Sequence, residues 1–338
     1  MPLMKAIQVK SPGSAFELVQ KEIPVPAGNE VLIKVAACGV CHGDALVKEG
    51  HFPGIKYPRI PGHEVMGTVV QLGARVEDWK LGQRVGVGWH GGHCFKCKAC
   101  RKGEFNACEN SLITGISTDG GYADFMVART EALVGIPDGL NFYEGAPLLC
   151  AGRTTFGGLK YSQARGGDLV AIHGLGGLGH LAVQYAVRLG FKTVVLSRGT
   201  DKEKLAFDLG AHIYIDTNTT DAAKELMRMG GARVILCTAP NSKAISELVA
   251  GLGRDGELIN VAGASEPMQI PPMLLLGGQR SVKGWVGGEI EETINFSTLF
   301  KVKPMVETFP LDRAIEAYDK MMTSKVHFRS VLKIGEIG

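Results

Sequence analysis

The chain has 338 residues, of which 45% are hydrophobic and 21% are charged, and its formal net charge at pH 7 is +3. This composition is typical of a globular protein rather than a disordered one, and the length predicts two domains because one hydrophobic core rarely serves so long a chain. The small charge, with no run of Lys or Arg and no basic stripe interleaved with aromatic residues, argues against nucleic acid as a partner.

Membrane insertion and secretion are not expected either. No apolar stretch reaches the roughly 18 residues that a membrane span needs, and the N-terminus lacks the apolar core of a signal peptide. The expected location is the cytoplasm, where the eight cysteines favour metal or redox roles over disulfides. Cys38 and Cys237 are expected to pack as small apolar side chains, although Cys38 also forms a C-x-x-C pair with Cys41.

The first 150 residues predict a β-rich domain. Gly and Pro are frequent there, and the apolar runs are short, as at residues 31–35, 65–70 and 84–87. Short strands separated by turn residues are typical of such a domain, whose long loops carry function.

From about residue 152 the pattern changes to alternating strands and helices. The run Leu169–Ile172 predicts a buried strand, and apolar residues then recur at helical spacing from Leu178 to Leu189. Further strands are expected at 193–196, 213–215, 233–237, 257–261 and 281–286, with helices at 202–209, 222–229 and 243–252. The alternation predicts a doubly wound parallel sheet and therefore an α/β fold class.

The last segment is expected to return to the first domain. Helices are predicted near 291–300 and 312–322, followed by a strand at 329–332. The predicted domains are therefore 1–151, 152–287 and the returning segment 288–338.

A loop with the spacing C-x-x-C-x-x-C-x₇-C holds four cysteines: Cys94, Cys97, Cys100 and Cys108. Its opening resembles the ferredoxin iron–sulfur run, but seven residues rather than three precede the fourth cysteine, and Glu109 rather than Pro follows it. Four thiolates complete a tetrahedron around Zn²⁺ and leave no position open, so the loop predicts a structural zinc site.

Cys41, His63 and Cys150 form a second candidate zinc site. Two thiolates and one imidazole leave a tetrahedral position open, as a catalytic zinc requires. Taken singly, each residue could equally be a buried core side chain, and only the combination favours a metal. Asp44 is a candidate acceptor for the imidazole N–H of His63, or alternatively an exposed loop carboxylate.

The segment Gly174-Leu175-Gly176-Gly177-Leu178-Gly179 is a G-x-G-x-x-G fingerprint. Such a run is a weak signal by itself, but here a predicted strand precedes it and a predicted helix follows, which is the context of a dinucleotide site. The glycines let the backbone approach a pyrophosphate at the helix N-terminus. The expected cofactor contacts are Gly174, Gly176, Gly177, Leu178 and Gly179, with Val261 and Val286 at the ends of two later strands.

The end of the second strand bears on the choice between NAD and NADP. An acidic residue there would bind the ribose 2′-hydroxyl and repel a 2′-phosphate. This chain has Ser197, Arg198 and Lys202 instead, and these groups suit a phosphate. The sequence thus favours NADP(H) over NAD(H), unless Arg198 is only a solvated surface residue.

With these motifs placed, the chain closely resembles the medium-chain zinc-dependent alcohol dehydrogenases from end to end. The motifs that carry the resemblance are the glycine fingerprint, the four-cysteine loop, Cys38-Gly39-Val40-Cys41-His42, Pro61-Gly62-His63-Glu64 and Leu149-Cys150-Ala151-Gly152. The resemblance implies a GroES-like catalytic domain, a Rossmann cofactor domain with a cleft between them, and a homodimer or homotetramer built through the Rossmann domains. Ser197, Arg198 and Lys202 are more similar to the NADP-dependent cinnamyl-alcohol-dehydrogenase branch than to the NAD-dependent ethanol branch.

The same resemblance assigns roles to residues. It implies two zinc ions per chain, with Cys41, His63 and Cys150 holding the catalytic one and Glu64 serving as an alternate ligand. It places His42 and Arg329 near the cofactor pyrophosphate and Thr154 against the nicotinamide.

Two positions depart from the family pattern. The family usually has Ser or Thr two residues after the zinc cysteine, where its hydroxyl starts a proton relay, and this chain has Gly43. Many NAD-dependent members have a relay His five residues after the cysteine, and this chain has Leu46. We hypothesise that a bound water replaces the missing hydroxyl.

The expected chemistry is hydride transfer between a nicotinamide and an alcohol or aldehyde whose oxygen the zinc binds as a Lewis acid. Phe52, Trp89, His90 and Trp285 are candidate walls of a substrate pocket, or ordinary packing residues. Such walls would suit aromatic or medium-chain primary alcohols and aldehydes. The alternatives are a polyol or secondary-alcohol dehydrogenase of the same superfamily and a non-catalytic nucleotide-binding zinc protein.

Overall fold

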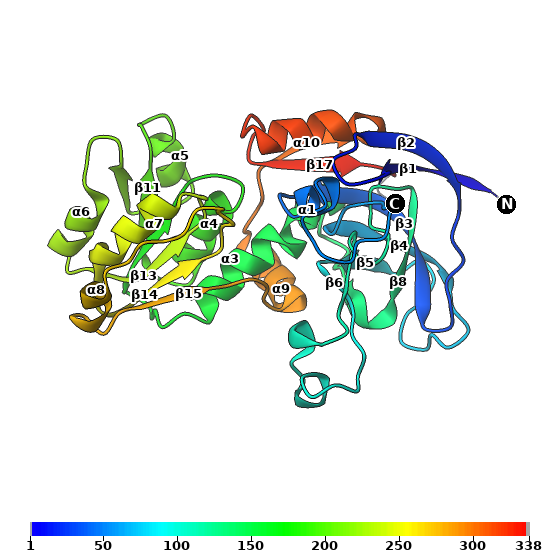
Figure 1. Cartoon of the computed structure of the whole chain (residues 1–338), viewed down its shortest axis with the longest axis horizontal. Coiled ribbons are helices and arrows are strands. Elements are labelled where there is room, and N and C mark those ends of the chain that lie inside the picture. Colours follow the sequence, from blue (N-terminus) through cyan, green and yellow to red (C-terminus); the bar gives the residue numbers. More distant parts are fainter. Residues whose placement is uncertain (1, 336–338) are drawn as a thin grey trace. The chain divides into compact units, whose positions relative to one another are not determined.

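The computed structural model describes residues 2–335, which form two compact units (Figure 1). The first unit comprises residues 2–150 and 304–335, and the second comprises residues 151–303. The chain therefore leaves the first unit once and returns to it.

A seven-stranded sheet forms the core of the first unit. β16 and β17 pair in parallel, and the remaining pairs are antiparallel. In sheet order the strands are β16 (Val306–Pro310), β17 (Arg329–Lys333), β3 (Glu30–Val40), β4 (Val65–Leu72), β5 (Arg84–Val87) and β9 (Leu133–Gly135), while β8 (Phe125–Arg129) also pairs with β3. The predicted β-rich domain is confirmed.

Smaller elements complete this unit. Two short antiparallel pairs are β1 (Leu3–Val9) with β2 (Phe16–Glu22) and β6 (His90–Gly92) with β7 (Leu112–Ile113). Its α-helices are α1 (Asp44–Lys48), α2 (Phe142–Gly145) and α10 (Ala314–Met322), with a 3₁₀ helix η4 (Ala146–Leu149) before Cys150. α10 lies beside β17 and buries Ala314, Ala317, Tyr318 and Met321 (Figure 1).

The second unit contains a six-stranded parallel sheet. Its order is β12 (Ile213–Asp216), β11 (Lys192–Ser197), β10 (Leu169–His173), β13 (Ala232–Cys237), β14 (Leu252–Asn260) and β15 (Ser281–Gly284). In chain order this is 3-2-1-4-5-6, the arrangement of the doubly wound dinucleotide-binding fold. All five residues of β10 are buried, as expected for a central strand covered on both faces.

The helices of the second unit follow the alternation that the sequence predicts. They are α3 (Ala151–Lys160), α4 (Gly179–Arg188), α5 (Glu203–Asp208), α6 (Ala222–Arg228), α7 (Ser242–Leu248), α8 (Pro272–Leu276) and α9 (Ile290–Phe300). The predicted α/β fold class is confirmed. None of the helices in residues 2–335 has the length and apolar character needed to cross a bilayer.

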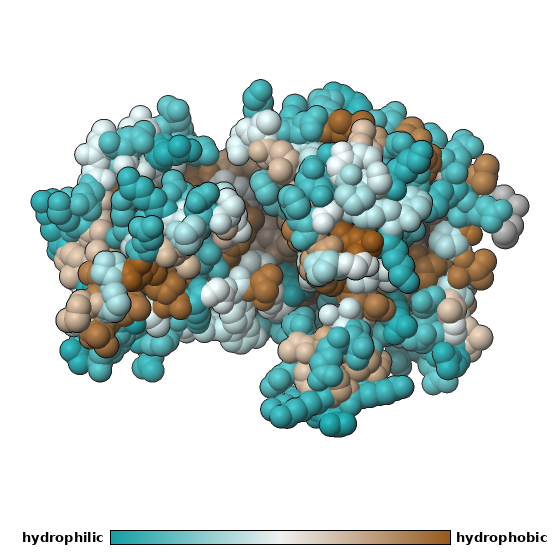
Figure 2. Space-filling view, in the orientation of Figure 1, coloured by the Kyte–Doolittle hydropathy of each residue, from teal (hydrophilic) through white to brown (hydrophobic). Residues whose placement is uncertain are grey.

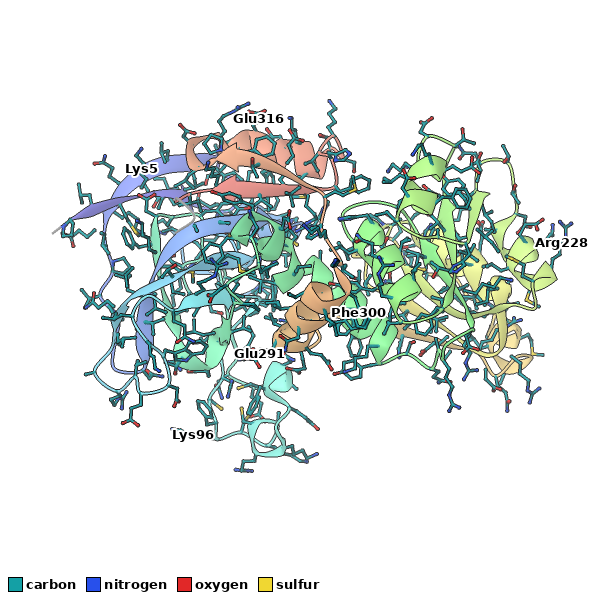
Figure 3. All side chains as sticks on the ribbon, turned by 180° about the vertical axis from the view of Figure 1, so that it is seen from behind. Lys5, Lys96, Arg228, Glu291, Phe300 and Glu316 are labelled. Carbon is teal, nitrogen blue, oxygen red and sulfur yellow. The ribbon has the colours of Figure 1, made fainter. Side chains whose placement is uncertain are left out.

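The predicted boundary of the returning segment at residue 288 differs from the structure, in which the second unit extends to residue 303. The reason is the packing of α9, whose ends are marked by Glu291 and Phe300 in Figure 3. The ring centroids of Phe296 and Phe156 in α3 lie 4.6 Å apart. The hydroxyl oxygens of Ser297 and Tyr185 in α4 lie 2.8 Å apart. The helix therefore belongs with α3 and α4 rather than with the first unit.

Candidate active site

Three segments of the first unit bring the predicted open zinc site together. β3 ends at Val40, immediately before Cys41, and β4 begins at Val65, immediately after His63 and Glu64. Because Cys38 pairs with Val65 in the antiparallel ladder, the two chain segments lie side by side. Cys150 follows η4, which packs against β3. One potential ligand atom from each of Cys41, His63, Glu64 and Cys150 lies within 4.8 Å of the others.

The geometry of this cluster fits a tetrahedral zinc ion. The sulfur atoms of Cys41 and Cys150 lie 3.8 Å apart, and two Zn–S bonds of about 2.3 Å at the tetrahedral angle would separate them by about 3.8 Å. The His63 imidazole is buried, and its Nε2 has no hydrogen-bond partner among the described residues. The pKa of Cys41 lies well below its usual value, because the Cys150 thiol donates a hydrogen bond to its sulfur and His63 stands beside it. These are the properties of a nitrogen and sulfur donor set ready for a metal.

Asp44 fixes the orientation of the His63 ring. It is 1% exposed, and its Oδ1 lies 3.1 Å from Nδ1 of His63. Its Oδ2 accepts hydrogen bonds from the Cys41 amide at 2.9 Å and from the Tyr122 hydroxyl at 2.8 Å. With the Nδ1 proton directed at Asp44, the Nε2 lone pair of His63 faces the other ligands.

Glu64 and Arg329 form a buried ion pair beside the cluster. Glu64 is fully buried and Arg329 is 4% exposed, and the guanidinium Nη2 donates to Oε1 of Glu64. Burial raises the pKa of Glu64 to about 7, although Arg329 acts in the opposite direction. Oε2 has no partner among the described residues, so it is free to reach a metal. The contact of Arg329 with a cofactor pyrophosphate stays a prediction.

A steric reason accounts for glycine at position 43. A Cβ atom there would lie 2.9 Å from Cε1 of His63 and 3.0 Å from Cζ3 of Trp89, and both distances are shorter than normal contacts. The two rings pack edge to face with centroids 4.9 Å apart. A serine hydroxyl at this position therefore requires one of these rings to move. The water that we expect in its place stays a prediction.

Substituting Gly43→Ala tests this steric account. We expect kcat to fall by about tenfold or more, because the added methyl group displaces a zinc ligand or the tryptophan that packs on it. Steady-state rates and zinc content measure the effect. Gly139→Ala is the matched control, since a Cβ at Gly139 meets no atom within 4 Å. Wild-type kcat and zinc content in Gly43→Ala would contradict the account.

The four-cysteine loop forms a second, closed cluster. The sulfur atoms of Cys94 and Cys100 lie 4.0 Å apart, and those of Cys97 and Cys108 lie 3.9 Å apart, close to the edge of a ZnS₄ tetrahedron. Backbone hydrogen bonds at Lys96 and Cys97 lower the pKa of Cys94 to about 6, which favours the thiolate. The cluster lies in the loop between β6 and β7, and Lys96 marks its lobe in Figure 3. With all four ligands from the protein, this site has no open position for a substrate.

The dinucleotide motif lies at the carboxyl end of the parallel sheet. Gly174 follows β10 and Gly179 begins α4, as the fingerprint predicts. Ser197 ends β11, and Nζ of Lys202 donates to the Leu175 carbonyl at 2.9 Å, so it reaches the glycine turn. Arg198 is exposed and lines a groove of about 1180 Å³.

The same groove contains residues that sequence reasoning missed, among them His173, Thr217 and Asn218. His173 is 9% exposed, its Nδ1 has no partner among the described residues, and burial lowers its pKa to about 4. In the sequence, the feature that could have indicated a role for His173 is its position immediately before Gly174, the first glycine of the fingerprint. All three follow or end strands of the sheet, where ligands of this fold class bind.

The other residues that are predicted to contact the cofactor are distributed over both units. Val261 follows β14 and Val286 follows β15, where its side chain is 86% exposed, and Thr154 is buried in α3. His42 is an exposed residue in the turn between β3 and α1. Their contacts with a cofactor stay predictions.

The candidate pocket residues also divide between the units. Phe52 packs against the core of the first unit, and Trp89 packs on His63. Nε2 of His90 lies 3.0 Å from Nδ1 of His93, next to the four-cysteine loop. In the second unit, Nε1 of Trp285 donates to the Gly287 carbonyl at 3.1 Å. Of the four, Trp89 has a contact with a candidate zinc ligand.

Comparison with known proteins agrees with this geometry. The alcohol dehydrogenase GroES-like domain matches residues 27–138, and the zinc-binding dehydrogenase family matches residues 177–301. The chain is 42% identical to alcohol dehydrogenase patD of Penicillium expansum, over 96% of this chain and 95% of the relative. It is 35% identical to cinnamyl alcohol dehydrogenase 2 of Rauvolfia serpentina, over 91% of this chain and 88% of the relative. The structure of CAD from Helicobacter pylori complexed with NADP(H) superposes with a TM-score of 0.86 at 27% identity and covers 98% of each chain.

The fold and the two sites together define a zinc-binding dehydrogenase that uses a nicotinamide cofactor. The chain belongs to the medium-chain zinc-dependent alcohol dehydrogenase family, with its GroES-like and Rossmann domains. Its reaction is the oxidation of alcohols and the reduction of aldehydes.

Proposed function

We propose that this enzyme reduces aromatic or medium-chain primary aldehydes with NADPH, and oxidises the corresponding alcohols, using one catalytic and one structural zinc ion per chain. The observation that carries the proposal is the cluster of Cys41, His63 and Cys150, in which a buried imidazole nitrogen has no hydrogen-bond partner within residues 2–335. Three protein ligands leave one tetrahedral position for the substrate oxygen.

The surrounding side chains prepare the site for this chemistry. When bound, zinc supplies a Lewis acid that polarises a carbonyl oxygen. Asp44 holds the His63 ring in one tautomer, and Trp89 restricts its movement. The buried pair of Glu64 and Arg329 places a carboxylate oxygen beside the ligands without leaving an isolated charge in the interior.

Arg198 and Lys202 support the preference for NADP(H). Both follow β11, where an acidic side chain would favour NAD(H), and both are cations that suit a 2′-phosphate. The related CAD from Helicobacter pylori was solved with NADP(H). The relative named cinnamyl alcohol dehydrogenase and the aromatic ring of Trp89 beside His63 support an aromatic substrate.

We further propose a homodimer or homotetramer that assembles through the second unit and functions in the cytoplasm. β15 is an edge strand, and exposed apolar side chains precede and follow it in the chain: Met273 in α8 at 71%, Leu276 at 69% and Val286 at 86%. Figure 2 shows hydrophobic (brown) atoms over the region of α8. Apolar side chains beside an open sheet edge are suited to pairing with a second copy. None of the eight cysteines, all of which lie within residues 2–335, forms a disulfide, as expected in a reducing compartment.

Initial rates of benzaldehyde reduction with NADPH and with NADH test the proposed cofactor and substrate. We expect kcat/KM to be at least about tenfold higher with NADPH, because charge-assisted hydrogen bonds to a phosphate contribute more than about 1.5 kcal/mol. Loss of nicotinamide absorbance measures both rates. Faster turnover with NADH would refute the cofactor assignment and leave the enzyme class intact. Absence of turnover with both would refute the substrate class.

A further inference from the structure

Two side chains of β12 hold the loop that follows β11. Gly199 in this loop has a φ of +69°, a conformation that favours glycine. Its amide donates a hydrogen bond to Oδ1 of Asp216 at 2.7 Å, and its carbonyl accepts one from the Tyr214 hydroxyl at 2.6 Å. Both polar backbone groups of one residue are therefore fixed by a neighbouring strand.

The same contacts join the ends of the two strands. Asp216 pairs with Ser197 in the parallel ladder, and the Thr217 amide donates to the Ser197 carbonyl at 2.9 Å. Oδ1 of Asp216 also accepts a hydrogen bond from the Asn218 amide at 2.9 Å. The two loops therefore form one connected structure along the groove that Arg198 lines.

The position of Arg198 depends on this connected backbone. Its side chain is exposed, and it lies between Ser197, which ends β11, and the fixed Gly199. A long side chain on a mobile loop would lose more conformational freedom when it binds an anion, and a fixed backbone reduces that cost. Oδ1 of Asp216 is also engaged by two backbone amides, those of Gly199 and Asn218.

We propose that Tyr214 and Asp216 are positioning residues for cofactor selectivity, which act by fixing Gly199 so that Arg198 is presented to the 2′-phosphate of NADP(H). The proposal rests on the proposed use of NADPH. It predicts that the two β12 side chains affect the binding of the phosphorylated cofactor and not the hydride-transfer step.

A double-mutant cycle between Tyr214 and Arg198 tests the proposal. We expect Tyr214→Phe to raise KM for NADPH about fivefold, the usual effect of one lost neutral hydrogen bond, with kcat and the KM for NADH unchanged. Arg198→Ala is expected to raise KM for NADPH by at least about tenfold. In the Arg198→Ala background, adding Tyr214→Phe should have no further effect, because Tyr214 acts through Arg198.

Tyr57→Phe is the matched control, since its hydroxyl also donates to a backbone carbonyl at 2.6 Å but lies in the first unit. The ratio of the KM for NADPH to the KM for NADH should not change in Tyr57→Phe. Asp216→Asn keeps an oxygen that can accept from Gly199 and should stay near wild type, whereas Asp216→Ala should behave as Tyr214→Phe does. A large gain in NADPH binding by Asp216→Asn would show that Asp216 acts by its charge, and would overturn the positioning role.

The outcomes separate this inference from the function on which it rests. A wild-type enzyme without NADPH preference refutes the proposed cofactor, and the inference with it. A wild-type enzyme that prefers NADPH, combined with an unchanged KM in Tyr214→Phe, refutes only the inference. Additive effects of Tyr214→Phe and Arg198→Ala would likewise refute it, because the two residues would then act independently.

Discussion

Replacing Cys150 with alanine is expected to lower kcat/KM for aldehyde reduction by at least about a thousandfold. Polarisation of the substrate oxygen by a metal contributes several kcal/mol to the rate, and each 1.36 kcal/mol corresponds to a factor of ten. Without Cys150, Cys41 loses the thiol whose sulfur lies 3.8 Å away and donates a hydrogen bond to it. The zinc content should fall by one ion per chain, because the four-cysteine loop keeps its own ligands.

Cys237→Ala is the matched control for this substitution. Cys237 is also buried, and burial alone raises its pKa far above the usual value, so it is a packing thiol rather than a ligand. This variant should keep its zinc and its turnover. If Cys150→Ala also retained both, the assignment of the catalytic cluster would be wrong.

Replacing Arg329 with methionine is expected to lower the free energy of unfolding by about 3–5 kcal/mol at pH 8, the usual cost of removing one partner of a buried ion pair. Glu64 is fully buried and would be left without its cation. Urea denaturation of the two proteins measures the difference. The double variant Glu64→Leu with Arg329→Met should recover most of the stability, because an apolar pair carries no uncompensated charge.

The sign of the pH dependence follows from the pKa of Glu64. Its value in the folded wild type is about 7, above that of an unfolded Glu, so the folded state binds the extra proton and stability falls as the pH rises towards 7. Arg329 lowers this pKa, so its removal raises the value further. The variant should therefore continue to lose stability above pH 7, where the wild type no longer does. Equal stability of Arg329→Met and wild type at pH 8 would contradict the structural role of the pair.

The parts of the site that are local in sequence could be predicted from the sequence. The spacing of Cys94, Cys97, Cys100 and Cys108 within one loop predicts a single tetrahedral cluster, and the structure brings their sulfur atoms together. The glycine fingerprint between a strand and a helix is found at the carboxyl end of β10. In both cases the chemistry is encoded in neighbouring residues and needs no distant contact.

Elements that depend on tertiary packing were harder to predict. The apolar run at 31–35 predicts a short strand, but β3 continues to Val40 through small residues because it pairs with both β4 and β17. α3 was not predicted, since Gly152, Gly157 and Gly158 are poor helix formers. Nine of its ten residues are buried, so packing against α4 and α9 compensates for their low propensity.

Contacts between residues far apart in the chain have no sequence signal. Tyr122 donates to Asp44 across 78 residues, and Arg329 pairs with Glu64 across 265 residues. Family resemblance implies that Arg329 is near the cofactor pyrophosphate, but it does not reveal the ion pair. Similarly, the sequence shows that position 43 lacks a hydroxyl, and only the packing of His63 and Trp89 gives a steric reason.

The zinc content of the purified wild-type enzyme, measured by mass spectrometry against protein concentration, tests the central claim most directly. The two clusters predict two zinc ions per chain, one in the closed site of four thiolates and one in the open site of Cys41, His63 and Cys150. One zinc ion per chain in a preparation that retains full activity would contradict the claim that the open cluster is a catalytic zinc site.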